Sequence, residues 1–268
     1  MIKTIYKLLK FLFQNWRKIH SMKVTVSNGQ FRLITPSESE CHLSALDDQT
    51  LIMDLEKDID TFWRTVPFHS VFLVYGLPIE NSRLGGTCTD RAIFFFDFVK
   101  DKYPESLNFR LHRALIKGNE THTVILVTIG NQTYLIDIGA NWPVMKLIPC
   151  FKEFKFNTFG INFNSKLDGS LLKVFMKRPE DPEFQEFLTV DMAPQSTKYV
   201  SKKISQRFDP DNQLPFANGL RYAVVHGDTF YFLKQDNTLS KERPFSIRSY
   251  NKMHLKTAAS HNSANGLR

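Results

Sequence analysis

Cysteine is scarce in this chain of 268 residues, which holds only Cys41, Cys88 and Cys150. None of the three lies at the short spacing to another cysteine that is typical of a zinc site. An odd and sparse set also argues against a disulfide framework. The sequence therefore predicts no metal and no disulfide scaffold, and it favours a reducing, cytoplasmic location.

Long apolar runs, internal repeats and low-complexity segments are also lacking. No run approaches the ~18 apolar residues that a membrane span needs. In residues 1–20, apolar side chains such as Ile2 and Leu9 recur at helical spacing, and lysines follow another face. This pattern is typical of an amphipathic helix in weak contact with a membrane, although an ordinary packed helix or a translation start at Met22 also fits. Lys10 and the lack of a small-residue cleavage site argue against a secretion signal.

Acidic residues are outnumbered, with 27 Asp and Glu against 35 Lys and Arg and a net charge of +8. A basic surface attracts anionic partners, such as a phosphorylated small molecule, but it is also an ordinary way to solvate a surface. No known nucleic-acid recognition motif occurs, so a nucleic-acid partner is not favoured.

The chain is rich in apolar residues, at 42%, including 24 Phe, which are enough for a sizeable core. Apolar spacing predicts a helix over residues 48–63 that ends at Pro67, and Thr87 and Asp90 form a capping-box pattern at the start of a second helix. A third helix is predicted over 196–208 after a run of strands. The predicted strands are one or two in 24–34 with a turn at Asn28-Gly29, then 109–116, 122–129, 133–138, 172–178, 220–227 and 229–235, with turns at Gly118-Asn119 and Gly130-Asn131.

The stretch "RLGGTCTDR", residues 83–91, places Cys88 at the first position of the second helix. Free N–H groups at a helix start stabilise anions, so a cysteine there tends to have a lowered pKa. Gly85 and Gly86 allow a tight turn and leave space for a substrate beside the sulfur. The sequence thus predicts that Cys88 is a nucleophile, and a buried apolar cysteine behind an ordinary glycine turn is the alternative.

A nucleophilic thiolate needs a base, and the base needs a group that orients it. If Gly130-Asn131 form a two-residue turn, Asp137 becomes the diagonal neighbour of His122 on one sheet face, about 7–8 Å away between backbones. Asp137 stands between two isoleucines, where a carboxylate is costly unless it is paired. We therefore expect His122 as base and Asp137 as its partner, although each also fits as a solvent-facing polar residue.

The remaining candidates are weaker. His112 and His69 have no acid placed beside them by a predicted hairpin, and Cys41 and Cys150 are next to no glycine turn or helix start. The two cysteines are therefore interpreted as structural.

The order of these motifs resembles the arylamine N-acetyltransferase family. The resemblance covers about residues 83–140 and rests on the glycine pair before Cys88, on "LNFRLHRALI", and on "HTVILVTIGNQTYLIDIG", with 34 positions from Cys88 to His122 and 15 from His122 to Asp137. "VPFHS" resembles that family's proline-phenylalanine motif. Departures are Leu84 before the glycines, Thr89 and Asp90 after the cysteine, and "GANWP", which puts Ala140 where the family has an aromatic residue.

The resemblance implies an α+β fold with an N-terminal helical region, a central antiparallel β-sheet or barrel, and a small C-terminal α/β lid. Its parts would be an amphipathic appendage over 1–22, a helical region over 23–103, a β-barrel-like domain over 104–192, the lid over 193–250 and a loose tail over 251–268.

The resemblance also implies a ping-pong reaction. Cys88, with His122 and Asp137, would take an acetyl group from acetyl-coenzyme A and pass it to an amine, hydrazine or hydroxylamine. Thr121 and Gly86 would contact the substrate, and no cofactor-binding residue is identified. The stretch "GTCTDRA" resembles the nucleophile motif of transglutaminase-like proteins almost as well, so a cysteine hydrolase or amide-exchanging enzyme is the second interpretation. A binding protein on the same scaffold is the third.

Overall fold

The structure is a computed structural model, and it describes residues 26–27, 30–31, 47–74, 84–206, 219–236 and 246–251. The chain divides into two compact units, residues 1–45 and 46–268. In the first unit, β1 (Val26–Ser27) and β2 (Gln30–Phe31) pair in antiparallel fashion, which confirms strands within 24–34, and the predicted turn residues Asn28-Gly29 lie outside the described residues. The interpretations of residues 1–20 and Cys41 concern positions outside the described residues. Among the helices that are described, none is long and apolar enough to span a bilayer.

The helices of the second unit begin where their caps predict. In α2 (Asp48–Thr65), the Asp47 side chain accepts hydrogen bonds from the first N–H groups, and the predicted apolar face is buried. The Thr87 cap precedes α4 (Cys88–Lys102), and the Ser196 cap precedes α5 (Thr197–Ser205). A single-turn helix, α3 (Val71–Val74), follows α2. Cys88 is therefore the first residue of its helix, as the sequence predicts.

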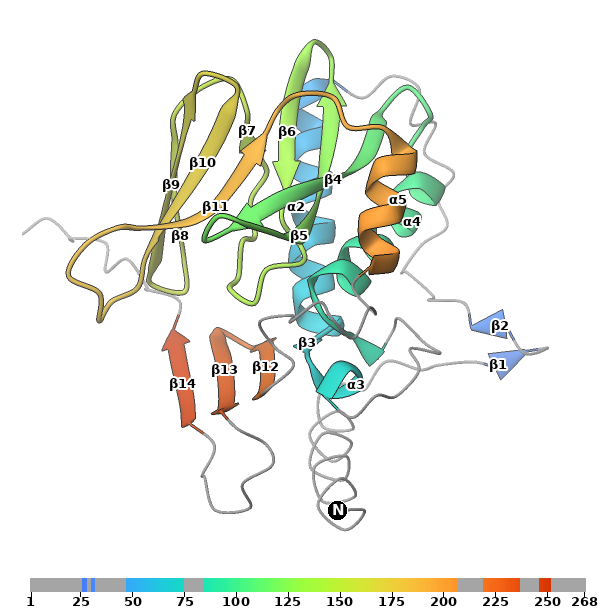
Figure 1. Ribbon diagram of the computed structural model, residues 1–268. Coiled ribbons are helices and arrows are strands. Elements are labelled where there is room, and N and C mark those ends of the chain that lie inside the picture. Colours follow the sequence, from blue (N-terminus) through green and yellow to red (C-terminus); the bar gives the residue numbers. More distant parts are fainter. Residues whose placement is uncertain are drawn as a thin grey trace, which may run out of the picture. The chain divides into compact units, whose positions relative to one another are not determined.

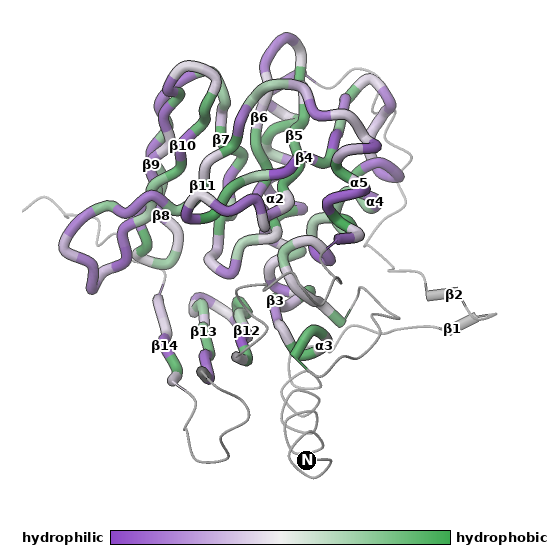
Figure 2. Tube along the Cα trace, in the orientation of Figure 1, coloured by the Kyte–Doolittle hydropathy of each residue, from purple (hydrophilic) through white to green (hydrophobic). Residues whose placement is uncertain are grey.

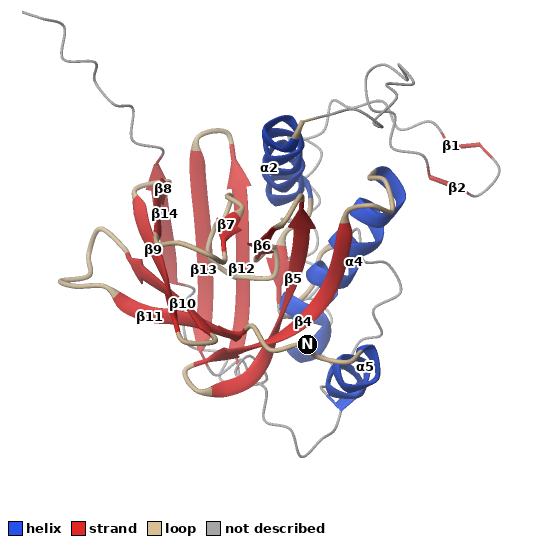
Figure 3. Ribbon diagram, turned by 90° about the horizontal axis from the view of Figure 1, so that it is seen from above, coloured by secondary structure: helices blue, strands red, loops and turns tan. Residues whose placement is uncertain are grey.

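An eight-stranded antiparallel sheet forms the centre of this unit, and it curves strongly in a barrel-like manner (Figures 1 and 3). Its strand order is β7-β6-β5-β4-β11-β10-β9-β8. The strands are β4 (Asn108–Ile116), β5 (Asn119–Ile129), β6 (Gln132–Ile136), β7 (Ile148–Pro149), β8 (Phe154–Thr158), β9 (Ile161–Asp168), β10 (Leu171–Lys177) and β11 (Gln185–Asp191). Together with the helices, this sheet confirms the predicted α+β class.

The hairpin of β5 and β6 has the register that the sequence predicts. Ile129 pairs with Gln132 across the two-residue turn, and the ladder runs to Ile125 and Ile136. Gly130 has φ 56°, a left-handed conformation that glycine adopts at little cost. Figure 2 shows hydrophobic residues along both strands, which α4 packs against through β5. The start of α4 and the end of this hairpin thus lie side by side.

Two parts of the strand prediction are wrong. The turn between β4 and β5 uses Lys117 and Gly118, both with positive φ, rather than Gly118-Asn119, because Ile116 pairs with Asn119. The sequence analysis also missed β8, β9 and β11, whose exposed faces carry many polar side chains. In β8, for example, half-buried aromatic residues alternate with exposed polar ones, so the apolar signal is short.

A second sheet joins the C-terminal strands to the segment before Cys88. Its order is β14-β13-β12-β3, with β3 (Phe68–His69), β12 (Gly219–His226), β13 (Thr229–Asp236) and β14 (Ser246–Asn251). The β12–β13 hairpin confirms the prediction for residues 220–235. His69 pairs with Tyr222, and Phe68 forms a bridge with Gly86. The sheet therefore supports the glycine turn that leads into α4. The domain boundaries of the sequence analysis remain predictions.

Candidate active site

The start of α4 is fixed by contacts within the motif itself. The Asp90 carboxylate accepts hydrogen bonds from the Thr87 N–H, at 2.9 Å, and from the Thr87 hydroxyl, at 2.8 Å. Gly85 has φ 90°, and a side chain there would lie 2.1 Å from the Pro67 carbonyl oxygen. A side chain on Gly86 would lie 2.7 Å from the Asp90 carboxylate. The two glycines therefore make room for backbone and cap, which sets Cys88 at the first turn; a substrate contact of Gly86 remains a prediction.

His122 and Asp137 meet directly. The Nε2 atom of His122 lies 2.7 Å from Oδ1 of Asp137, and both side chains are buried. β6 ends at Ile136, so Asp137 stands at the start of a turn rather than within the ladder, and its Oδ1 also accepts the Ala140 N–H at 3.1 Å. The hairpin register brings the two residues together as predicted, and the turn orients the Asp137 carboxylate toward the imidazole of His122.

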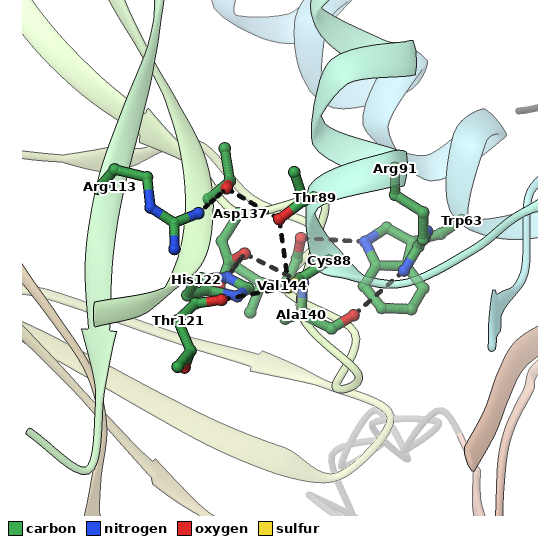
Figure 4. Close-up of polar contacts among 11 residues, drawn as sticks. Trp63, Cys88, Thr89, Arg91, Arg113, Thr121, His122, Asp137, Ala140 and Val144 are labelled. Carbon is green, nitrogen blue, oxygen red and sulfur yellow. Dashed lines mark hydrogen bonds and ion pairs between the residues drawn. The ribbon is translucent and has the colours of Figure 1, made fainter. Parts of the chain in front are cut away.

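The turn after Asp137 packs against the backbone of Cys88. A side chain on Gly139 would lie 2.6 Å from the Cys88 carbonyl oxygen, which is too close for any real contact. Because Gly139 has no side chain, the start of α4 can approach the end of β6 closely. Figure 4 shows Cys88, His122 and Asp137 in one small region formed by α4, β5 and the turn after β6.

The electrostatics of this region favour a charged thiol and a charged imidazole. Burial lowers the pKa of His122, but the charge of Asp137 and the hydrogen bond to it outweigh burial and raise that pKa. Burial likewise works against ionisation of Cys88, and the hydrogen bond and charge of His122 outweigh it, so the pKa of the thiol is lowered. The arrangement supports a thiolate–imidazolium pair near neutral pH.

A second polar chain reaches the sulfur from β4 and β5. Arg113 donates from Nη1 to the Thr123 hydroxyl, which lies 3.0 Å from the Thr89 hydroxyl. The Thr89 hydroxyl lies 3.8 Å from the Cys88 sulfur, and the charge of Arg113 contributes to the lowered pKa of Cys88. The sequence analysis missed this chain, because Arg113 opposes Thr123 in the observed β4–β5 pairing, whereas the predicted Gly118-Asn119 turn would have placed Val124 opposite Arg113.

Thr121, predicted to contact substrate, lies beside the thiol. Its carbonyl oxygen is 3.8 Å from the Cys88 sulfur, which can donate to it, and its side chain is half-buried. A groove of about 580 Å³ opens nearby, between β4, the start of β5 and α5. It is lined by Arg113, Leu115, Glu120, Asp191, Ala193, Pro194, Gln195, Ser196 and Tyr199. The groove thus borders the polar chain through Arg113, and neither Cys88 nor His122 lines it.

Arg91 is a further residue that the sequence analysis missed. Its guanidinium is fully buried and donates from Nη1 to the Ala140 carbonyl oxygen at 3.1 Å. The signal in the sequence is a single arginine three positions after Cys88, just before an apolar run. A helix places residues three positions apart on one face, so Arg91 lies on the Cys88 side of α4.

The other candidate residues lie apart from this region. The His112 ring bonds to the Asp191 carbonyl oxygen at 2.7 Å and the His69 ring to that of Leu84 at 2.9 Å, and burial lowers both histidine pKa values. Burial raises the pKa of Cys150 to about 12. Within the described ranges, no group of three or more His, Cys, Asp or Glu side chains is arranged to hold a metal ion.

Comparison with known proteins finds similarity in structure only. No family model matches the chain, and no curated protein matches it in sequence. Solved structures of arylamine N-acetyltransferases do match. The enzyme from Salmonella typhimurium has a TM-score of 0.57 and 14% identity over 69% of this chain and 75% of its own.

Two further enzymes of this kind match over three quarters of the chain. The arylamine N-acetyltransferase of Mycobacterium smegmatis, solved as a variant with one substitution, has a TM-score of 0.54 and 14% identity over 75% of this chain and 80% of its own. The NAT3 enzyme of Bacillus cereus, which has a Cys-His-Glu catalytic triad, has a TM-score of 0.56 and 12% identity over 75% of this chain and 85% of its own. The chain therefore has the arylamine N-acetyltransferase fold.

Proposed function

We propose that this chain is a cysteine-dependent acyltransferase that moves an acetyl or other acyl group from coenzyme A to an amine, hydrazine or hydroxylamine. The observation that carries the proposal is the buried row of Cys88, His122 and Asp137, with His122 bonded to Asp137 at 2.7 Å and Cys88 at a helix start. The fold shared with arylamine N-acetyltransferases supports the same reaction class.

In the first half of the reaction, the Cys88 thiolate attacks the carbonyl carbon of the coenzyme A thioester. The bond between that carbon and the coenzyme A sulfur breaks, and the imidazolium of His122 gives its proton to the departing sulfur. The first N–H groups of α4 have no acceptor within the helix, and the Thr87 side chain accepts the N–H of Asp90, so the N–H of Cys88 is the one we assign to steady the negative oxygen of the tetrahedral intermediate. The product of this step is an acyl-cysteine.

In the second half, the acceptor nitrogen attacks the acyl-cysteine. His122, now neutral, takes the proton from that nitrogen, and the bond between the acyl carbon and the Cys88 sulfur breaks. Asp137 holds the imidazole in one orientation and stabilises its charged form in both halves, as an aspartate does in other triads. Cys88 returns as a thiolate paired with the imidazolium.

Substrate contacts follow from what lies beside the sulfur. We assign Thr121 and Gly86 as substrate-contacting residues because the Thr121 carbonyl oxygen is 3.8 Å from the Cys88 sulfur and Gly86 ends the turn before it. Ala140 stands where the resemblance calls for an aromatic side chain, so the acceptor site is shaped differently. A free thiol nucleophile is favoured by a reducing compartment, so we place the reaction in the cytoplasm.

The intact mass of the protein after incubation with acetyl-coenzyme A tests the proposal. An acetyl-sized increase on Cys88, found without any acceptor and lost when an arylamine or hydrazine is added, is the expected result. The Cys88→Ser variant is the control, since its hydroxyl is not ionised by His122. Modification of Cys88 by glutamine amides or peptides but not by thioesters would instead support the transglutaminase-like alternative, and no modification by either would support a binding role.

A further inference from the structure

Arg91 occupies an unusual place for a cation. Its side chain is 0% exposed and lies beside the Trp63 ring (Figure 4). Its guanidinium carbon is 4.0 Å from the centre of that ring and 5.5 Å from the centre of the Phe62 ring. Nη1 donates to the Ala140 carbonyl oxygen, while Nε and Nη2 have no hydrogen-bond partner among the residues that the structure describes. A buried charge with two unpaired N–H groups costs stability, and an apolar side chain would fit the same position without that cost.

The positive charge of Arg91 is therefore explained by the charged groups that surround it. Burial lowers the pKa of Arg91 to about 9, and the negative charges of Asp137 and then Cys88 oppose that effect. Arg91 thus remains a cation at neutral pH. The third titratable group that faces it is His69 on β3, whose pKa Arg91 lowers further. Of these neighbours, Asp137 and Cys88 are the ones that a cation stabilises.

Arg91 is also tied to the turn that carries Asp137. Both polar groups of the Ala140 backbone are engaged, because its N–H bonds to Asp137 Oδ1 and its carbonyl oxygen accepts from Arg91. The other carboxylate oxygen of Asp137 is buried, and no hydrogen-bond partner for it lies within the described part of the chain. The position of Asp137 consequently depends on this turn, and the Arg91 bond holds the turn to α4.

The sum of the charges in the site also explains why a cation lies there. A thiolate, an imidazolium and a carboxylate together carry one net negative charge, in a region that water hardly reaches. Arg113, on β4, contributes to the lowered pKa of the thiol. Arg91 is a cation that interacts with Asp137, and it lies on the same helix face as Cys88.

We infer that Arg91 is a positioning residue, whose buried cation balances Asp137 and whose bond to Ala140 holds the Asp137 turn against α4, so that His122 keeps Cys88 ionised. This inference rests on the proposed role of Cys88 as nucleophile. It assigns to Arg91 no contact with the substrate.

The pH profile of iodoacetamide alkylation at Cys88, read by peptide mapping, tests the inference in the full chain. In Arg91→Met, the midpoint of the profile should move up by about one pH unit, because a nearby positive charge is lost. Arg91→Lys should keep the midpoint within a few tenths of a unit of the wild-type value, because it keeps the charge. Thermal unfolding of the same variants reports stability separately, so a shift of the alkylation midpoint is distinguished from a loss of the fold.

Arg91→Gln is the second variant, and it serves also if Arg91→Met does not fold. It retains an N–H donor for Ala140 without the charge, so its midpoint should again move up. A wild-type midpoint in Arg91→Met or Arg91→Gln would overturn the inference, whatever the change in stability. Because alkylation needs no acyl donor, a protein that is never acetylated would contradict the proposed function and leave this test intact.

Discussion

Cys88 and Cys150 are two buried free thiols in one chain with opposite chemical character. Their exposed fractions are nearly equal, at 7% and 6%. Burial disfavours the thiolate at both positions, yet the pKa of Cys88 is lowered and that of Cys150 is raised to about 12. Burial alone therefore does not decide the reactivity of a cysteine in this fold.

The difference lies in the neighbours. Within the described residues, the Cys150 sulfur has one polar contact, 3.8 Å to the Ile148 carbonyl oxygen, and Arg110 only partly offsets the effect of burial. Cys88 stands at the start of a helix and faces the imidazole of His122, which Asp137 keeps charged. The comparison teaches that an ion pair with His122, whose charge Asp137 stabilises, outweighs the effect of burial on the Cys88 thiol. Cys150 has no such ion pair among the described residues.

His122→Ala should make Cys88 resemble Cys150, and it is the largest effect that we expect. Without the imidazole, burial acts against the thiolate, and only the weaker effects of Thr89 and Arg113 oppose it. The pKa of Cys88 therefore rises, and the thiolate is lost between pH 6 and 7. Acyl loading should fall by a factor that reaches about 10⁶ in a comparable triad. Iodoacetamide labelling should drop to the rate of Cys150.

The pH dependence of Cys88 labelling provides a control for the effect of His122→Ala. Since the wild-type pKa of Cys88 is lowered from its usual value, wild-type labelling should rise through a midpoint below pH 9 and then level off, whereas His122→Ala should rise only at higher pH. His112→Ala is the matched variant, because His112 is also a buried strand histidine but bonds to a backbone carbonyl. A shifted Cys88 midpoint in His112→Ala would weaken the assignment.

Asp137→Asn tests whether the charge of Asp137 stabilises the charged imidazole of His122. The change keeps the size of the side chain and removes the charge that raises the pKa of His122, so the ion pair weakens. By analogy with a serine-based triad, acyl loading should fall by about 10⁴. Asp137→Glu should retain much more activity, because a carboxylate remains beside the imidazole. If Asp137→Glu lost as much activity as Asp137→Asn, a carboxylate at this position would not be sufficient, and the role assigned to its charge would be contradicted.

The region around Cys88 was largely predictable because its signals are local. A cap, a glycine pair and a two-residue turn each fix a few residues, and the turn then determines register, so the meeting of His122 and Asp137 follows by counting. The burial of the α2 face follows in the same way from its spacing. Such features depend little on the rest of the chain.

The other parts depend on long-range pairing, which local patterns do not report. The short strand β3 exists because Phe68 and His69 pair with β12, about 150 positions further along the chain. Arg91 was missed because its partners are the carbonyl of Ala140 and the ring of Trp63, which only the fold brings to it. The groove beside Arg113 was also unpredictable, since it is built from separate strands and α5.

Gly139→Ala probes the close approach that distinguishes the Cys88 region. The new methyl carbon would lie 2.6 Å from the Cys88 carbonyl oxygen, so α4 or the turn must shift. Overpacking of this kind costs about 1–3 kcal/mol, and we expect acyl loading to fall by roughly 10-fold to 100-fold. Gly118→Ala is the control, because it has open space at a positive φ and should lower stability without changing the labelling of Cys88.

Cys150→Ala should have the smallest effect on the site, and it completes the comparison of the two thiols. Removing the sulfur leaves a small cavity beside Ile148, so the free energy of unfolding should fall by about 1 kcal/mol. The acyl loading rate and the pH midpoint of Cys88 should stay within about a factor of two of wild type, because neither His122 nor Asp137 contacts Cys150. Peptide mapping and denaturant unfolding check the two parts. A tenfold slower acylation of Cys88 in Cys150→Ala, with stability little changed, would mean that the two thiols are coupled and that the neighbours of Cys88 alone do not explain its reactivity.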